Sequence, residues 1–222
     1  KILKRNFIET ATKIMLDAPY QKPEKSEFDI DRIGVKASQF SFARLQNADP
    51  VLGVDMSSTG EVGCIGDSYE EALLTAMIAT GYNIPSKEKA IMISSGDTKE
   101  KVALLDAIHA LIDNGYKICA SEGTAKFLKA NNVPVAEVAW PDEEHSDKPN
   151  IMKMIAEHKF DLVINIPKNH KKRELTNEYR IRRAAIDHNI SLITNANLAN
   201  AFIMAFCNLA VNDIDIKSWN EY

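Results

Sequence analysis

The sequence predicts an α/β protein built on a doubly wound, five-stranded parallel sheet, preceded by a region of different character. From about residue 86, short apolar segments alternate with amphipathic segments, which is the pattern of successive βαβ units. Residues 1–85 lack this alternation and combine helical, Lys/Glu/Pro-rich and extended stretches. We therefore expect a boundary near residue 85, with a complete α/β domain over residues 86–222.

The five expected strands are short and rich in apolar residues, as strands buried on both faces of a sheet should be. They cover residues 90–94, 116–120, 135–139, 161–166 and 191–194.

Helical periodicity follows most of these strands. Residues 98–115 place Val102, Leu105, Ile108 and Ile112 on one face of a single expected helix, and Gly115 ends it. The other helical segments of this domain cover residues 124–132, 149–158, 176–189 and 197–211. In the first 85 residues, we expect helices over residues 7–17 and 68–80 and extended segments around residues 30–37 and 61–66.

Composition argues against several classes of protein. The net charge of -4 does not favour nonspecific binding of nucleic acid, which needs a broad basic surface. No apolar stretch reaches the roughly 18 residues of a membrane helix. The three cysteines, Cys64, Cys119 and Cys207, are far apart and lie among apolar residues, so we expect buried free thiols in a cytoplasmic protein. The five histidines lack metal-ligand spacing, so no metal site is expected.

Polar residues follow the expected strands, where a doubly wound sheet opens its ligand cleft. They are Ser94 to Asp97, Ser121 to Thr124, Trp140, Asn165, Lys168, Asn169, His170, Thr194 and Asn195. Hydroxyls, amides and the N–H groups of a helix N-terminus all donate hydrogen bonds to phosphate or carboxylate oxygens. The sequence therefore favours a small anionic ligand at this edge.

Each of these features also has a purely structural interpretation. Ser121 can be an ordinary N-cap whose hydroxyl accepts a bond from a helix N–H, and a cap can coexist with an anion site. Trp140 can be a packing residue, and residues 168–174 can be a solvated loop. The arginines of residues 180–183 can be surface charges or can pair with carboxylates across an interface. No Gly-rich nucleotide motif and no catalytic nucleophile set is recognised.

Four segments together resemble the carboxyl-terminal part of the large, synthetase component of carbamoyl phosphate synthetase. They are residues 40–66, 130–141, 161–167 and 179–187, and the resemblance runs through essentially the whole chain in order. It implies that residues 86–222 have a methylglyoxal-synthase-like (MGS-like) fold that binds an allosteric effector. It also implies that residues 1–85 are the α+β tail of the second ATP-grasp half, which phosphorylates carbamate.

The resemblance further implies a ligase that makes carbamoyl phosphate from bicarbonate, ammonia and ATP for pyrimidine and arginine synthesis. ATP and Mg²⁺ (or Mn²⁺) would serve the full-length enzyme, whereas this part would be regulatory and without catalytic residues. The implied partners are a nucleotide or acetylglutamate type of effector, the rest of the synthetase chain and a glutaminase small chain.

The family's effector pocket implies a set of binding residues in this chain. It comprises Lys101 (with Lys99 as the alternative), Ser121, Thr124, Trp140, Asn165, Lys168, Asn169, Thr194 and Asn195. Trp140 resembles the acetylglutamate-activated members, but Glu178 stands where they carry an amide and would disfavour a dicarboxylate. Two alternatives remain: a free-standing MGS-like lyase, disfavoured because no aspartate follows the fourth strand, and a structural interaction module.

Overall fold

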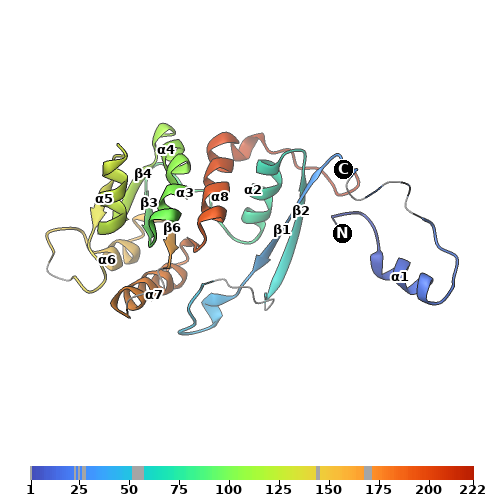
Figure 1. The fold of residues 1–222 in the computed structure, drawn as a ribbon, viewed down its shortest axis with the longest axis horizontal. Helices are drawn as coiled ribbons and strands as arrows, with labels where there is room; N and C mark the ends of the chain where they lie inside the picture. The colour runs from blue at the N-terminus through green and yellow to red at the C-terminus, as the bar shows by residue number, and fades with distance from the viewer. Residues whose placement is uncertain are drawn as a thin grey trace.

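The computed structural model describes residues 2–22, 24, 26, 29–51, 58–143, 146–167 and 172–222, except for the side chains of residues 172–174. Its centre is a five-stranded parallel sheet with the strand order β5-β4-β3-β6-β7 (Figure 1). The strands are β3 (Ala90–Ser95), β4 (Lys117–Ser121), β5 (Ala136–Val138), β6 (Phe160–Ile166) and β7 (Ser191–Ile193). The predicted fold class is confirmed, and each predicted strand lies within one residue of the observed bounds.

Helices cover both faces of this sheet, because side chains alternate between the faces along each strand. Ile91 and Ile93 belong to one core with α4, α5 and α8, whereas Met92 belongs to a second core with α6 and α7. Figure 1 shows α6 and α7 on the opposite side of the sheet from α4 and α5. The helices are α3 (Thr98–Ala103), α4 (Leu105–Asp113), α5 (Glu122–Ala130), α6 (Ile151–Ala156), α7 (Lys172–Asp187) and α8 (Ala196–Asn208).

The single helix predicted over residues 98–115 is wrong, because it is divided at Leu104 into α3 and α4. The interruption changes which residues face the core: Leu104 is 1% exposed, whereas Val102, which the prediction placed on the apolar face, is 57% exposed. A periodicity of 3.6 residues assumes one continuous helix, so its phase is lost at a break.

The N-terminal region, residues 1–85, contains α1 (Phe7–Met15), β1 (Ile33–Gln39), the short helix η1 (Phe42–Arg44), β2 (Gly60–Gly66) and α2 (Tyr69–Ala79). β1 and β2 form an antiparallel pair in which Val35 lies opposite Cys64. α2 begins after Ser68, whose hydroxyl accepts a hydrogen bond from the Glu71 N–H. Leu73 and Leu74 of α2 pack into the same core as α4, α5 and α8, so packing continues across residue 85. The boundary itself stays a prediction.

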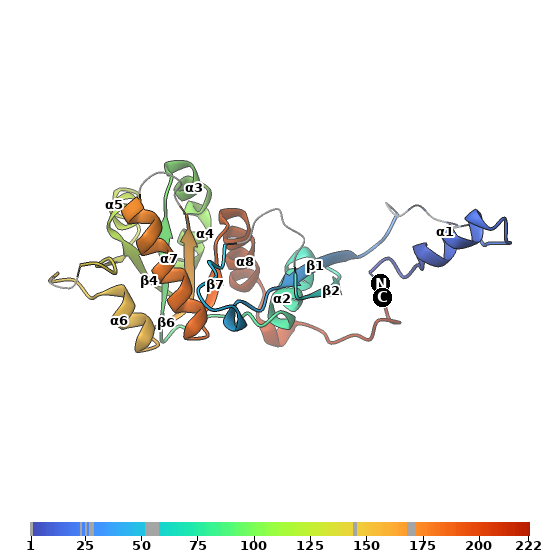
Figure 2. The same cartoon turned by 90° about the horizontal axis from the view of Figure 1, so that it is seen from below.

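The chain ends and α1 lie at the far side of the hairpin from the parallel sheet (Figures 1 and 2). α1 has no buried residue, and Ile8 and Met15 are 81% and 82% exposed. The last segment, which includes the short helix η2 (Val211–Asp213), returns to the N-terminus, where the Lys4 ammonium donates to the Tyr222 carbonyl. A cavity of ≈ 560 Å³ lies among these terminal segments and is lined in part by Arg5, Arg32 and Lys217.

Candidate functional site

A buried polar layer lies at the carboxyl ends of the three central strands. We call Ser94, Ser95, Ser121 and Asn165 the strand-end layer; each is at most 5% exposed. Strand register places Ser94 directly beside Asn165, and the hydroxyls of Ser94 and Ser121 are 2.9 Å apart. By the alternation along the strands, Ser94, Ser121 and Asn165 share the face of α6 and α7.

Ser121 occupies the N-cap position of α5 but does not cap the helix with its side chain. Its backbone is extended and its hydroxyl makes no capping hydrogen bond, because the hydroxyl instead pairs with that of Ser94. The ordinary N-cap interpretation of this hydroxyl is therefore wrong. Since the Ser121 side chain leaves the first-turn N–H groups of α5 uncapped, this helix end retains the polarity that favours an anion.

Thr124 ties the first turn of α5 to the end of β3. Its hydroxyl accepts a hydrogen bond from the Ser95 N–H at 3.0 Å and donates to the Ser95 carbonyl at 3.2 Å. A hydroxyl has a single proton to donate. In this arrangement the Thr124 hydroxyl donates its proton to the Ser95 carbonyl. To donate to a ligand, Thr124 would have to break this bond, and its ligand role stays a prediction.

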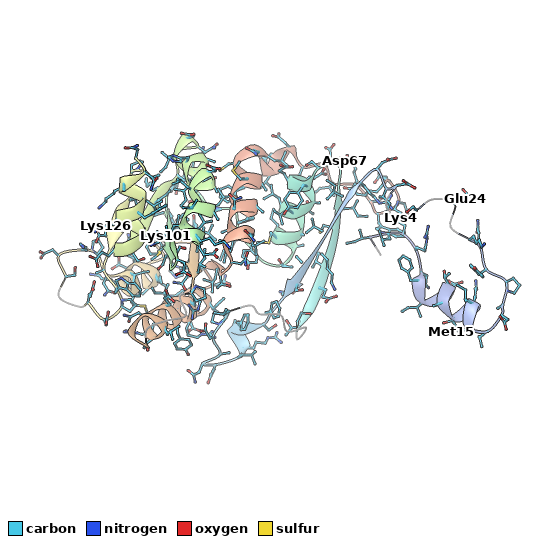
Figure 3. The ribbon with its side chains drawn as sticks, viewed as in Figure 1. Lys4, Met15, Glu24, Asp67, Lys101 and Lys126 are labelled. Atoms are coloured by element: carbon cyan, nitrogen blue, oxygen red, sulfur yellow. The ribbon has the colours of Figure 1, made fainter. Side chains whose placement is uncertain are left out.

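Lys101, the cation that the sequence predicted for this site, reaches the first turn of α5. It extends from α3, and its ammonium donates to the Gly123 carbonyl at 3.3 Å, in the first turn of α5 (Figure 3). Lys99, the alternative, has an exposed side chain on the same short helix. The geometry therefore favours Lys101 over Lys99 as the lysine that contacts the first turn of α5.

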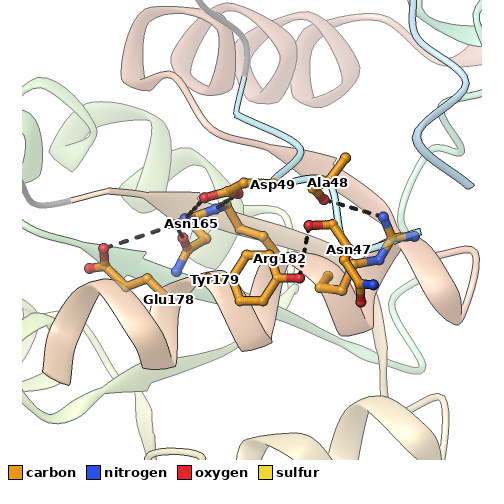
Figure 4. Close-up of polar contacts among 8 residues, drawn as sticks. Asn47, Ala48, Asp49, Asn165, Glu178, Tyr179 and Arg182 are labelled. Atoms are coloured by element: carbon orange, nitrogen blue, oxygen red, sulfur yellow. Dashed lines mark hydrogen bonds and ion pairs between the residues drawn. The ribbon is translucent and has the colours of Figure 1, made fainter. Parts of the chain in front are cut away.

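Asn165 contributes a side-chain amide to the strand-end layer, and only one of the two polar atoms of this amide has a described partner. It is 0% exposed, and its Oδ1 accepts a hydrogen bond from Arg182 Nη1 at 2.8 Å (Figure 4). Its Nδ2 is buried and has no hydrogen-bond partner among the described residues, and the same holds for Ser95 Oγ. A buried donor without a partner is costly and calls for an explanation such as a ligand.

Arg182 joins this layer to the N-terminal region. Its Nε and Nη2 donate to the two carboxylate oxygens of Asp49 at 2.7 and 2.6 Å, so the pair is bidentate. This pairing supports the interpretation in which the arginines of residues 180–183 bind carboxylates across an interface. Glu178 is 2% exposed, with its Oε2 4.0 Å from Arg182 Nη1, so its carboxylate is buried beside a cation.

The remaining predicted residues that the structure describes follow the two edge strands of the sheet. Asn195 caps α8, because its Oδ1 accepts a hydrogen bond from the Leu198 N–H at 3.0 Å. Thr194 directly follows the edge strand β7, whose Ile193 pairs with Ile164, so Thr194 lies one strand away from Asn165. Trp140 follows the opposite edge strand β5, and its backbone N–H donates a hydrogen bond to Glu143 Oε2 at 3.1 Å. The two edges are separated by four strand spacings, about 19 Å. The predicted residues Lys168 and Asn169 lie outside the described residues.

The structure thus places Lys101 and Thr124 at the first turn of α5, next to Ser121, with Asn165 two strands away and Thr194 one strand beyond it. Trp140 follows the opposite edge strand, and Asn195 caps α8. The predicted binding set omitted Arg182, and it omitted Ser94 although Ser94 is among the polar residues that follow the expected strands. Alignment of the ends of neighbouring parallel strands places Ser94 beside Asn165 and would have included it. Within the part of the chain that the structure describes, no group of three or more His, Cys, Asp or Glu residues could hold a metal ion, and no helix is long and apolar enough to cross a membrane.

Comparison with known proteins agrees with this architecture. Residues 103–194 match the family described as MGS-like domain. The chain is 44% identical over 91% of its length to the multifunctional protein pyr1-3 of Dictyostelium discoideum and 37% identical over 98% to the multifunctional protein ura1 of Schizosaccharomyces pombe. It is 38% identical over 100% of its length to a protein of Aquarana catesbeiana named carbamoyl-phosphate synthase [ammonia], mitochondrial.

The chain spans only 9%, 10% and 15% of the lengths of these three relatives. The matched part nevertheless extends over nearly all of the chain, including the N-terminal region that precedes the MGS-like match. The chain therefore belongs to the carbamoyl-phosphate synthase family and carries its MGS-like domain, as the sequence motifs predicted.

Proposed function

We propose that the strand-end layer, together with Lys101 and the first turn of α5, binds one small anionic effector and that this binding regulates carbamoyl phosphate synthesis by a longer protein. The observation that carries the proposal is the buried Nδ2 of Asn165, which has no described partner. Strand register places Asn165 beside Ser94, whose hydroxyl is 2.9 Å from that of Ser121. An oxygen atom of a phosphate or carboxylate group would accept its hydrogen bond.

The chemistry of the neighbouring groups supports an anion rather than a cation or an apolar ligand. Asn165 Nδ2, the serine hydroxyls and the first N–H groups of α5 are donors, and Lys101 adds a positive charge over the same helix turn. A buried donor without a partner costs about 1 to 3 kcal/mol, which a ligand oxygen would recover on binding.

The wider role rests on the family. We propose that the full-length protein is an ATP-dependent ligase that makes carbamoyl phosphate for pyrimidine and arginine synthesis, with ATP and Mg²⁺ or Mn²⁺ bound outside this chain. The 222-residue chain alone would be catalytically inactive. Its proposed partners are the rest of the synthetase chain and a glutaminase small chain. We propose a cytoplasmic location from the free cysteines; because the frog relative's name includes "mitochondrial", cell fractionation is the test of the compartment.

Calorimetric titration of the 222-residue chain tests the binding site. The probes are inorganic phosphate, UMP, IMP, phosphoribosyl pyrophosphate and N-acetylglutamate. We expect at least one probe to bind, and Lys101→Met to weaken it about tenfold, since a charge-assisted hydrogen bond contributes about 1.5 kcal/mol. The matched control is Lys153→Met on α6, whose side chain is 77% exposed; it should bind like the wild type.

Two results would contradict the proposal. The first is silence from all five probes in a folded sample, which favours a structural module. The second is equal weakening by Lys101→Met and Lys153→Met, which indicates only a response to net charge.

A further inference from the structure

We infer that Arg182 is a positioning residue: it sets the side-chain amide of Asn165 for the effector and couples that amide to the segment of residues 42–49, which we call the docking segment. The inference rests on the proposed function of the strand-end layer. It goes beyond it by assigning a role to a residue that need not touch the ligand and by naming the route to the N-terminal region.

The first step concerns the orientation of the Asn165 amide. A guanidinium carries only donors, so Arg182 Nη1 can pair with Asn165 Oδ1 but not with Nδ2. This contact, at 2.8 Å between two fully buried groups, fixes the orientation of the amide: Oδ1 is occupied by Arg182, and Nδ2 is left as the available donor. If Arg182 moved, the amide could turn and present its oxygen atom, which would repel an anion.

The second step concerns what holds Arg182. Asp49 binds Nε and Nη2 through both carboxylate oxygens, and its side chain is 41% exposed, so it lies at the boundary with solvent rather than in the layer. Glu178 lies 4.0 Å from Nη1, the nitrogen that serves Asn165. Asp49 and Glu178 therefore both attract the Arg182 guanidinium, Asp49 at Nε and Nη2 and Glu178 at Nη1. When the Asp49 carboxylate no longer binds Arg182, the Glu178 carboxylate is positioned to attract Nη1 away from Asn165 Oδ1.

The third step concerns the docking segment itself, which α7 holds at several points (Figure 4). Arg183 Nη1 donates to the carbonyls of Phe42, Leu45 and Ala48 at 3.1, 3.0 and 3.3 Å. The Tyr179 hydroxyl donates to the Asn47 carbonyl at 3.1 Å. Because these bonds fix the backbone around Asp49, docking of the segment and orientation of Asn165 occur together. Linkage then requires that a ligand at Asn165 stabilise the docked segment by the same free energy by which docking strengthens the ligand.

A double-mutant cycle on ligand affinity tests this role in the 222-residue chain. Asp49→Asn removes the charge that holds Arg182 without touching Asn165. We expect it to weaken binding of the best of inorganic phosphate, UMP and N-acetylglutamate about fivefold or more, the lower end of typical coupling between sites. In the Asn165→Ala background, the same change should have no further effect, because the amide through which it acts is gone.

The control is Asp187→Asn, which makes the same charge change on α7 and removes only the partner of Arg183. It should leave affinity within twofold of the wild type. Additive effects of Asp49→Asn and Asn165→Ala would overturn the proposal, since a merely structural loss is additive for two separate sites.

A second measurement does not depend on a ligand. The side-chain amide resonances of Asn165 in a ¹⁵N correlation spectrum should shift or broaden in Asp49→Asn and remain in place in Asp187→Asn. If no probe binds the wild type, the proposed effector site fails while this spectrum still decides the role of Arg182. Unchanged Asn165 resonances in Asp49→Asn would overturn the inference in either case.

Discussion

Replacement of the buried Arg182 by methionine should destabilise the protein more than the same replacement of its neighbour Arg183. Arg182 is 2% exposed, and methionine has a similar length without the charge. The change removes the bidentate pair with Asp49 and the hydrogen bond to Asn165, and it leaves the buried carboxylate of Glu178 beside an apolar side chain. The buried carboxylate makes this loss larger than that of a surface ion pair.

The structure sets the size of the effect. Breaking a buried ion pair by removing one partner costs about 3 to 5 kcal/mol. Asp49 is 41% exposed and can be hydrated after the change, so we expect the lower end, about 3 kcal/mol. For a chain of this length, that loss lowers Tm by about 6 to 12 °C. The double variant Arg182→Met/Glu178→Gln should recover about 1 kcal/mol, because it also removes the buried carboxylate charge.

Urea unfolding followed by circular dichroism measures these differences. The matched control is Arg183→Met, one residue further on, where Asp187 is 55% exposed and the released carbonyls can be hydrated; we expect a loss of about 1 kcal/mol. The reasoning is refuted if Arg182→Met is no less stable than Arg183→Met, or if the Glu178→Gln change further destabilises the Arg182→Met variant.

Three further predictions concern the core, acid stability and thiol chemistry. Leu111→Ala should cost about 2 to 5 kcal/mol in urea unfolding, because Leu111 is 0% exposed. Burial alone raises the pKa of Asp161, but hydrogen bonds from Ser86 and Lys89 outweigh burial and lower that pKa. The stability that the Asp161 carboxylate contributes is therefore present above its unfolded-state pKa of about 3.9 and is lost as pH falls through its folded-state pKa. The urea midpoint should therefore fall more between pH 6 and pH 3 for the wild type than for Asp161→Asn. Burial raises the pKa of the Cys207 thiol from 9.0 to about 11, so iodoacetamide should label it roughly a hundredfold more slowly than free cysteine at pH 8.

The parallel sheet could be predicted because each strand carries its signal locally. Residues 161–166, for example, contain the uninterrupted apolar run Leu162 to Ile164, and such a run is typical of a strand buried on both faces. The division of α3 and α4 at Leu104 could not be predicted, because tertiary packing selects which residues face the core. The pairing of β1 with β2 also depends on contacts between distant residues, although both segments were predicted to be extended.

The candidate site shows the same division. Ser121, Thr124 and Asn165 were predicted because they follow expected strands, and the carboxyl ends of parallel strands meet at one edge. The partners of those side chains were not predicted. The Ser121 hydroxyl binds Ser94 instead of capping α5, and Arg182 binds Asp49 across 133 residues of sequence. Local sequence offers no signal for a contact of that separation.

A titration followed by ¹⁵N correlation spectra tests the central claim most directly. The tightest-binding probe of the calorimetric series is added to the labelled 222-residue chain. The account predicts that the largest shifts occur at residues 94–96, residues 121–124 and the Asn165 side-chain amide, and that Lys101→Met needs about tenfold more probe to reach the same shifts. Largest shifts at the terminal cavity, which Arg5, Arg32 and Lys217 line in part, would contradict the account and place the anion site elsewhere.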